Sequence, residues 1–153
     1  MQNIGDDRVM VPKAKFGSAP IHAMLVPFPI VCLIGAFLTD IAYANSSQVQ
    51  WANFSEWLLL FGTALIVPAA AFGLIDFLGN PPQNRPRIGW WHMGLNIAAA
   101  IIAFVNNFVH SRDGWTGVVP TGLVLSGLTV AILAVSGHLG GELAYRHVAR
   151  RGR

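Results

Sequence analysis

Charged side chains are the scarcest feature of this sequence. The 153 residues include ten lysines and arginines and seven aspartates and glutamates, so that 11% are charged, while 54% are hydrophobic. An average soluble domain has roughly 25% charged residues. A chain with so few charges and so much apolar surface is typical of a protein embedded in lipid, and we expect the bilayer to be its main surrounding.

Cysteine is nearly absent as well, and so are several familiar sequence signals. The single cysteine, Cys32, excludes an intrachain disulfide, a covalent Cys-x-x-Cys-His haem attachment and a cysteine-bound iron–sulfur cluster. The first twenty residues mix acidic and basic side chains and lack an apolar core, so we expect no cleavable signal peptide. The chain has no P-loop and no basic motif with interleaved aromatic residues, and we expect no nucleic-acid partner.

The most prominent feature of the sequence is a set of four long apolar stretches. None of them contains Asp, Glu, Lys or Arg, and each is long enough for the roughly 20 residues that a helix needs to cross about 30 Å of hydrocarbon. They cover residues 16–39, 57–75, 88–111 and 114–141. The apolar residues run continuously, without the alternation of barrel strands. The sequence therefore predicts an all-α, integral membrane four-helix bundle.

The expected helices form one transmembrane domain and leave no room for a second domain. They span residues 20–44, 55–78, 88–110 and 118–145. The domain, at residues 20–145, lies between an N-terminal tail at 1–19 and a basic C-terminal tail at 146–153. A polar loop at 45–55 and a proline-rich turn at 80–89 are predicted to join its helices.

The basic residues are distributed unevenly between the two sides that this topology creates. Nine of the ten lie in the tails and in the turn between the second and third helices, which share one side, and Arg112 alone lies on the other. Lysine and arginine are enriched in the cytoplasmic segments of membrane proteins. We therefore predict a multi-pass protein of the cytoplasmic membrane with both termini in the cytoplasm.

Polar side chains gather at both ends of the predicted bundle. The cytoplasmic end receives seven of them from all four helices, more than scattered interfacial residues would give. They are His22, Asp76, His92, His138, Glu142, Tyr145 and His147. At the opposite end, Asp40 lies inside the first helix, where an ionised carboxylate is costly without a partner. We expect Arg112, or the amides of Asn106 and Asn107, to pair with it in a structural clamp.

Helical periodicity predicts which of these residues face the interior. One stripe of the third helix is small and polar, as an interior face of a membrane bundle should be. It consists of His92, Asn96, Ala99, Ala103 and Asn106. On the fourth helix, His138 and Glu142 share a face, and His147 projects to the opposite side of a straight helix.

Two prolines disturb the start of the first helix. Pro27 and Pro29 have no N–H groups to donate to the preceding turn, so the helix must loosen there or begin with a non-helical segment. Either way, His22 is freed from strict helical phase. We expect it to aim toward His92.

Four segments of the chain resemble successive signature segments of a bacterial family of small four-helix membrane proteins, catalogued as a domain of unknown function. They read "HAMLVPFPI", "GLIDFL", "WHMGLNIAA" and "SGHLGGELAYRH". The resemblance extends from His22 to His147. The chain departs from the family's pattern at Ala23, where proline is usual, at His138, where an aromatic residue is commoner, and in its "HVARRGR" ending.

The resemblance implies a small four-helix fold in the bacterial inner membrane. Some members of that family are fused to Rieske iron–sulfur or cytochrome c modules. The resemblance therefore also implies a place in membrane electron transfer.

Our leading hypothesis is a b-type cytochrome in which two histidines from facing helices hold one haem. His22 and His92 lie on different helices at similar predicted depth, and neutral imidazole is a standard axial ligand of haem iron. His147 is a further candidate cofactor ligand. Arg87 and Arg146 are expected to pair with the haem propionates at the cytoplasmic interface. Other membrane redox subunits and a quinone are the expected partners.

Other interpretations stay open. A divalent metal such as zinc or iron is an alternative cofactor, because carboxylate and imidazole are its usual ligands, and its site would comprise His22, His92, Asp76 and Glu142. A non-catalytic accessory subunit of a larger respiratory or photosynthetic complex would also be small and lack a nucleophile with a triad-like base. Finally, the polar residues would need no cofactor if they satisfied helix ends and one another, or formed a network that moves protons.

Overall fold

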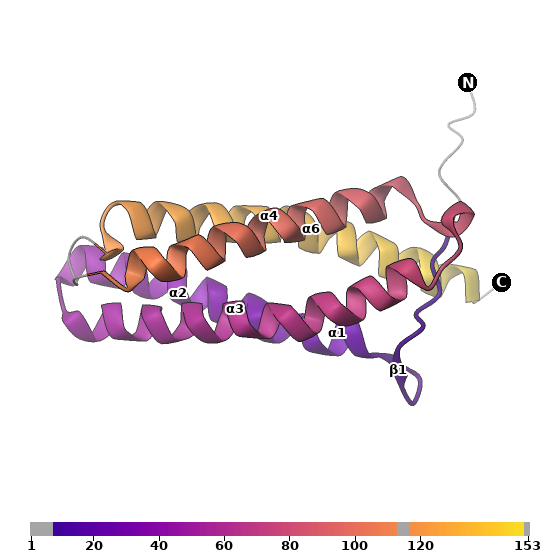
Figure 1. Ribbon diagram of the computed structural model, residues 1–153, viewed down its shortest axis with the longest axis horizontal. Coiled ribbons are helices and arrows are strands. Elements are labelled where there is room, and N and C mark those ends of the chain that lie inside the picture. The colour runs from indigo at the N-terminus through magenta and orange to yellow at the C-terminus, as the bar shows by residue number, and fades with distance from the viewer. Residues whose placement is uncertain (1–7, 113–116, 152–153) are drawn as a thin grey trace, which may run out of the picture.

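The computed structural model describes residues 8–112 and 117–151, with side chains up to Arg146. Most of the described chain is helical (Figure 1). Two short strands, β1 (Lys15–Phe16) and β2 (Ala19–Pro20), precede the helices. The helical elements are α1 (Ile21–Leu25), α2 (Pro27–Ser46), α3 (Val49–Leu78), the 3-10 turn η1 (Pro82–Asn84), α4 (Arg87–His110) and α6 (Thr121–Arg151).

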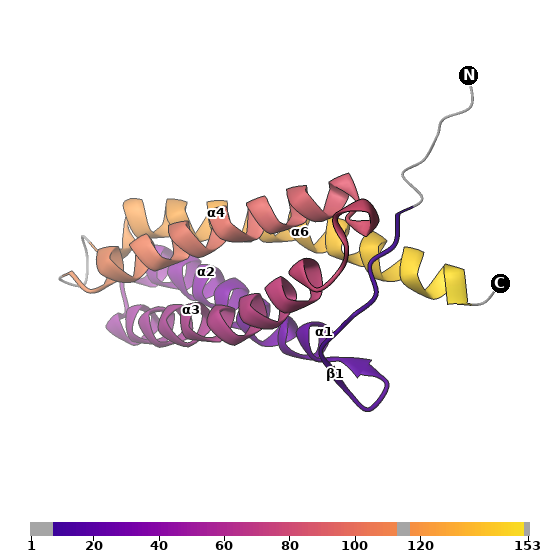
Figure 2. The same cartoon turned by 45° about the vertical axis from the view of Figure 1, so that its right-hand side comes forward.

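Among the described residues, four spans are long and apolar enough to cross a membrane, which confirms the predicted all-α membrane bundle. They run Ile21–Ser46, Val49–Leu78, Arg87–His110 and Thr121–Arg146. The spans lie side by side and alternate in direction, so both ends of the chain emerge at one end of the bundle (Figures 1 and 2). We call this the terminal end and the opposite one the loop end.

The first span is divided into two helices at Val26. Pro27 and Pro29 have no N–H groups, so two carbonyl groups of α1 lose their usual helical donors. Across the division, the N–H of Val26 donates to the oxygen of His22 at 3.0 Å, and that of Ile30 donates to the oxygen of Val26 at 3.5 Å. The predicted loosening is confirmed, and α1 is a short helix with few backbone bonds to α2.

The connection between the first two spans is shorter than the sequence suggests. The polar segment at 45–55 is predicted to be a loop, whereas α3 already begins at Val49. The added helical turns bury Ala52 against Tyr43 and Val118. Burial of these apolar side chains outweighs the polar composition of the segment.

The bundle consists of two antiparallel hairpins. Helices α2 and α3 pack closely to form the first, and α4 and α6 form the second. The hairpins join where α2 lies against α6 and α3 lies against α4. Each hairpin starts at the terminal end (Figure 1). The two halves are therefore related by an approximate twofold rotation about the bundle axis.

The buried positions of the two hairpins repeat along the sequence. Buried residues of α2 correspond to buried residues of α4 that lie 70 positions later: Pro29 and Ala99, Leu33 and Ala103, Ala36 and Asn106, Asp40 and His110. Buried residues of α3 and α6 correspond with a shift of 67 positions: Ser55 and Gly122, Leu59 and Ser126, Gly62 and Thr129, Ala69 and Ser136. The shift of 70 also makes His22 the counterpart of His92.

Candidate functional site at the terminal end of the bundle

The ring of His22 is held against α3 by a hydrogen bond to the backbone. Its Nδ1 lies 2.8 Å from the carbonyl oxygen of Ala69. A carbonyl oxygen only accepts hydrogen bonds, so we assign the proton to Nδ1, which donates. In a neutral imidazole the other nitrogen, Nε2, then keeps the lone pair that a metal ligand needs.

His92 repeats this arrangement against α6. Its Nδ1 lies 2.9 Å from the carbonyl oxygen of Ser136 and 3.0 Å from the hydroxyl of the same residue. By the same argument Nδ1 donates and Nε2 keeps its lone pair. The amide nitrogen of Asn96 lies 3.4 Å from Nδ1 and 3.2 Å from Nε2, and 2.7 Å from the Ser136 hydroxyl. The Asn96 amide therefore contacts both nitrogens of the His92 ring.

The two rings approach each other between the hairpins. Their centroids are 6.4 Å apart and their planes are inclined by 84°. The pairing follows the twofold relation, since Ala69 and Ser136, whose carbonyl oxygens accept the two Nδ1–H groups, are themselves counterparts. The terminal end thus contains a symmetric pair of imidazoles that come from different helices, as the sequence predicts for His22 and His92.

Two glycines provide the surfaces on which these rings lie. A Cβ atom at Gly73 would come within 2.9 Å of the His22 ring, and one at Gly140 within 3.0 Å of the His92 ring. Gly73 and Gly140 are counterparts as well, with the same shift of 67 positions. Each ring therefore packs directly on a helix backbone, one turn beyond the carbonyl that accepts its hydrogen bond.

Adding a methyl group at one of these glycines should move a histidine ring. We expect Gly140→Ala to displace the ring of His92 and to cost about 1 kcal/mol of stability, because the added atom would crowd Cε1. Gly137→Ala is the matched control, since a Cβ there meets nothing within 4 Å. NMR spectra of histidine-labelled protein in detergent should shift for Gly140→Ala alone. Unchanged spectra in both variants would contradict the packing described for His92.

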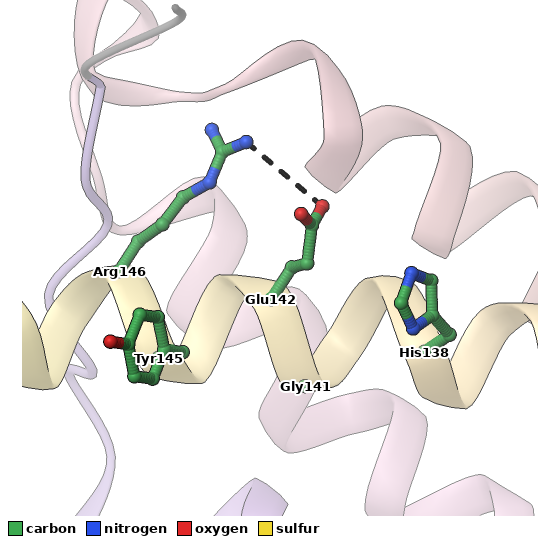
Figure 3. Close-up of a pocket in the computed structure, with 5 residues that line it drawn as sticks. All are labelled: His138, Gly141, Glu142, Tyr145 and Arg146. Carbon is green, nitrogen blue, oxygen red and sulfur yellow. Dashed lines mark ion pairs between the residues drawn. The ribbon is translucent and has the colours of Figure 1, made fainter.

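The two predicted acidic metal ligands are not gathered with the histidines. Asp76 accepts the backbone N–H groups of Lys13 and Ala14. Glu142 is exposed on α6, with one oxygen 4.0 Å from the guanidinium of Arg146 (Figure 3). Within the part of the chain that the structure describes, no three His, Cys, Asp or Glu side chains are placed to hold a metal ion. The predicted four-residue metal site is therefore not assembled in this structure.

The predicted cationic residues lie at the terminal end. Arg87 is the first residue of α4, shortly before His92, and its side chain is exposed. Arg146 lies near the end of α6 beside Glu142. The side chain of His147, the third histidine proposed from the sequence, lies outside the described residues.

A shallow hollow of about 500 Å³ occupies one outer face of α6 (Figure 3). It is lined by His138, Gly141, Glu142, Tyr145 and Arg146. This confirms that His138 and Glu142 share a face of the helix. All five residues belong to α6 and His138 is exposed, so the hollow is distinct from the pair of interior histidines.

A second polar cluster lies inside the loop end. Asp40 of α2 is completely buried, and its Oδ1 lies 2.9 Å from Nε2 of His110, the last residue of α4. Ser55 of α3 donates to the same oxygen, and Ser126 of α6 donates to Oδ2 at 2.6 Å. One carboxylate therefore connects all four long helices.

The partners predicted for this carboxylate are wrong. Arg112 is exposed beyond the end of α4, and the amide of Asn107 donates to a threonine of α3. Asn106 reaches the carboxylate only indirectly, through the Ser126 hydroxyl, to which it donates at 2.8 Å, and through Nδ1 of His110, which lies 3.1 Å from its side-chain oxygen. The partner from α4 is His110, because it lies on the buried face of that helix opposite Asp40, whereas Arg112 lies past the helix end.

Sequence reasoning also missed the hydroxyl groups of α6. Ser126, Thr129 and Ser136 are all buried, and two of them bond to the polar pairs at opposite ends of the bundle. A signal was present, since hydroxyl side chains at helical spacing in an apolar segment mark a face that packs against other helices.

These features define a class of protein, a small membrane bundle of two similar hairpins with a half-buried pair of histidines at one end and a buried polar cluster at the other. Within that class, the chain belongs to the family described as "Predicted membrane protein (DUF2231)", whose model matches residues 18–152. The match confirms the family resemblance of the four sequence segments. No curated protein and no solved structure matches the chain.

Proposed function

We propose that the protein is a b-type cytochrome that transfers electrons in the membrane, with one haem held between His22 and His92. The observation that carries this proposal is the pair of imidazoles, whose centroids lie 6.4 Å apart. Two nitrogen–metal bonds of about 2 Å each would hold the centroids of facing imidazoles roughly 6 Å apart. The observed spacing fits two axial ligands of one iron.

The surroundings of the rings support the same proposal. A hydrogen bond from Nδ1 to a carbonyl oxygen orients an imidazole and leaves Nε2 for the metal, which is the usual arrangement of a ligand histidine. Gly73 and Gly140 leave the rings in contact with the helix backbone. A haem held only by histidines also suits a chain with one cysteine, and we assign Arg87 and Arg146 to its propionates.

Electron transfer is the chemistry that two nitrogen ligands favour. If His22 and His92 both held the haem, the protein would supply both nitrogen ligands and would leave no open position for oxygen or another substrate. Because basic residues are enriched at the terminal end, we propose that this end, and hence the haem, faces the cytoplasm of a bacterial inner membrane. We propose other membrane redox subunits or a quinone as the partners in electron exchange.

An absorption spectrum tests the proposal. Protein produced with ample haem and purified in detergent should show a Soret band, a pyridine haemochrome of b type, and a low-spin ferric signal in electron paramagnetic resonance. Absence of the Soret band and of the haemochrome would refute a cytochrome. Stoichiometric zinc or iron in that haem-free protein would instead support a metal site.

A further inference from the structure

The two histidines of the proposed haem site are supported very differently, although they occupy equivalent positions. His92 lies in α4, which continues without interruption from Arg87 to His110. His22 lies in α1, which has five residues and is divided from α2 at Val26. Helix α1 therefore fixes the backbone of His22 less firmly than α4 fixes that of His92. Contacts from outside the helix must hold His22 in place.

Those contacts come from the end of α3. Oδ1 of Asp76 accepts the backbone N–H groups of Lys13 at 2.6 Å and of Ala14 at 2.9 Å. One turn further, the side-chain amide of Asn80 exchanges two hydrogen bonds of 2.9 Å with the backbone of Val11. We call residues 11–14 the strap. Two polar side chains, one in the last turn of α3 and one just after its end, thus hold the strap through its backbone, as a neighbouring strand would.

The strap connects directly to the start of α1. The carbonyl oxygen of Ala14 accepts the N–H of Ile21, the residue before His22, at 3.1 Å. The chain between them folds back in the short hairpin of β1 and β2, where Lys15 pairs with Pro20. A displacement of the strap would therefore be transmitted to the backbone of His22.

The second hairpin has no equivalent carboxylate. The shift of 67 positions that relates α3 to α6 makes Leu143 the counterpart of Asp76. We infer that Asp76 is a positioning residue that holds His22 in place through the strap, and that His22 is the exchangeable axial ligand whereas His92 is the anchored one. This inference rests on the proposed haem site.

Carbon monoxide is the probe that distinguishes the two ligands, because it binds ferrous haem only where an axial position opens. In the wild-type full-length protein we expect little carbon monoxide adduct. In Asp76→Ala the adduct should increase roughly tenfold or more, since two hydrogen bonds to a charged acceptor are lost. In Asp76→Asn the remaining amide oxygen still accepts, so the increase should be smaller. Equal increases in both variants would overturn the positioning role, and so would an unchanged Asp76→Ala.

A second variant and a second measurement keep the inference testable if Asp76→Ala does not fold. Lys13→Pro removes one of the two N–H donors without changing α3, and it should increase the adduct as well. Leu143→Ala is the matched control at the equivalent position and should not. Trypsin cleavage after Lys15 should be faster in Asp76→Ala and Lys13→Pro than in the control, whether or not haem is bound. Unchanged cleavage would refute the positioning role of Asp76, whereas absence of haem from the wild type would refute the proposed function and the assignment of His22 as a ligand but not the strap.

Discussion

Purified His92→Ala protein is expected to contain roughly tenfold less haem than the wild type, or less still. His92 supplies one of the two proposed bonds to the iron, and its ring is fixed by Ser136 and by the backbone at Gly140. Among the described residues, His110 is bonded to Asp40 at the loop end and His138 is exposed on the outer face of α6. Neither is placed to replace it. The pyridine haemochrome assay measures the loss.

The His22→Ala variant should change the haem spectrum more than the haem content, unlike His92→Ala. Because His92 still binds, we expect this variant to keep part of its haem, to lose the low-spin spectrum and to form a carbon monoxide adduct in the ferrous state. His138→Ala is the control for both, since it removes a histidine from the same end without touching the interior pair. A wild-type spectrum in either interior variant, or loss of haem in the control, would contradict the assignment of the ligands.

Asp40→Ala is expected to produce the largest loss of stability. Removing the carboxylate leaves Nε2 of His110 and the hydroxyls of Ser55 and Ser126 without their shared partner in a fully buried place. Leaving several buried hydrogen-bonding groups without a partner costs about 3 kcal/mol, which corresponds to a fall in melting temperature of roughly 10 °C for a chain of this size. Thermal unfolding in detergent, followed by circular dichroism, measures it.

Two control variants test whether the buried Asp40 carboxylate stabilises the protein through its hydrogen bonds. Asp40→Asn keeps oxygen and nitrogen atoms beside the serines and should cost less than Asp40→Ala, whereas Glu56→Ala removes a half-buried acid beside Ser55 and should cost little. Below its melting temperature, Asp40→Ala should keep the spectrum of the wild type, because the clamp lies at the opposite end from the histidines. Loss of the spectrum there would show that the two ends are coupled.

The number and type of the helices followed from the sequence because charge-free stretches of this length have few other solutions in a membrane. The approach of His22 to His92 also followed, since alternating spans bring the starts of the first and third helices to one end. Local composition did not reveal where α3 begins. The position of Val49 depends on Ala52 packing against Val118, a residue far along the chain.

The partners of the acids were harder to predict, and for a physical reason. Arg112 was predicted as the partner of Asp40 because its charge is opposite. The contact depends instead on which residue lies on the inward face of α4, and that residue is His110. Asp76 pairs with backbone N–H groups of the strap, and these groups occur at every residue except proline. A pattern of side chains in the sequence therefore cannot predict which backbone N–H groups a carboxylate will bind. The prediction that Asp76 binds a metal was based on its charge alone, and these backbone hydrogen bonds are a second use of the same carboxylate.

The twofold relation between the hairpins has a consequence for any flat molecule seated on the bundle axis. A haem between His22 and His92 would present its two faces to counterpart helices, so turning it over about that axis exchanges surroundings that are nearly alike. Residues that differ between the halves distinguish the two orientations, among them the amide of Asn96 and the hydroxyl of Ser136 on the His92 side and the divided helix on the His22 side. The proposed cofactor should therefore occur as two isomers, whose ratio these differences set.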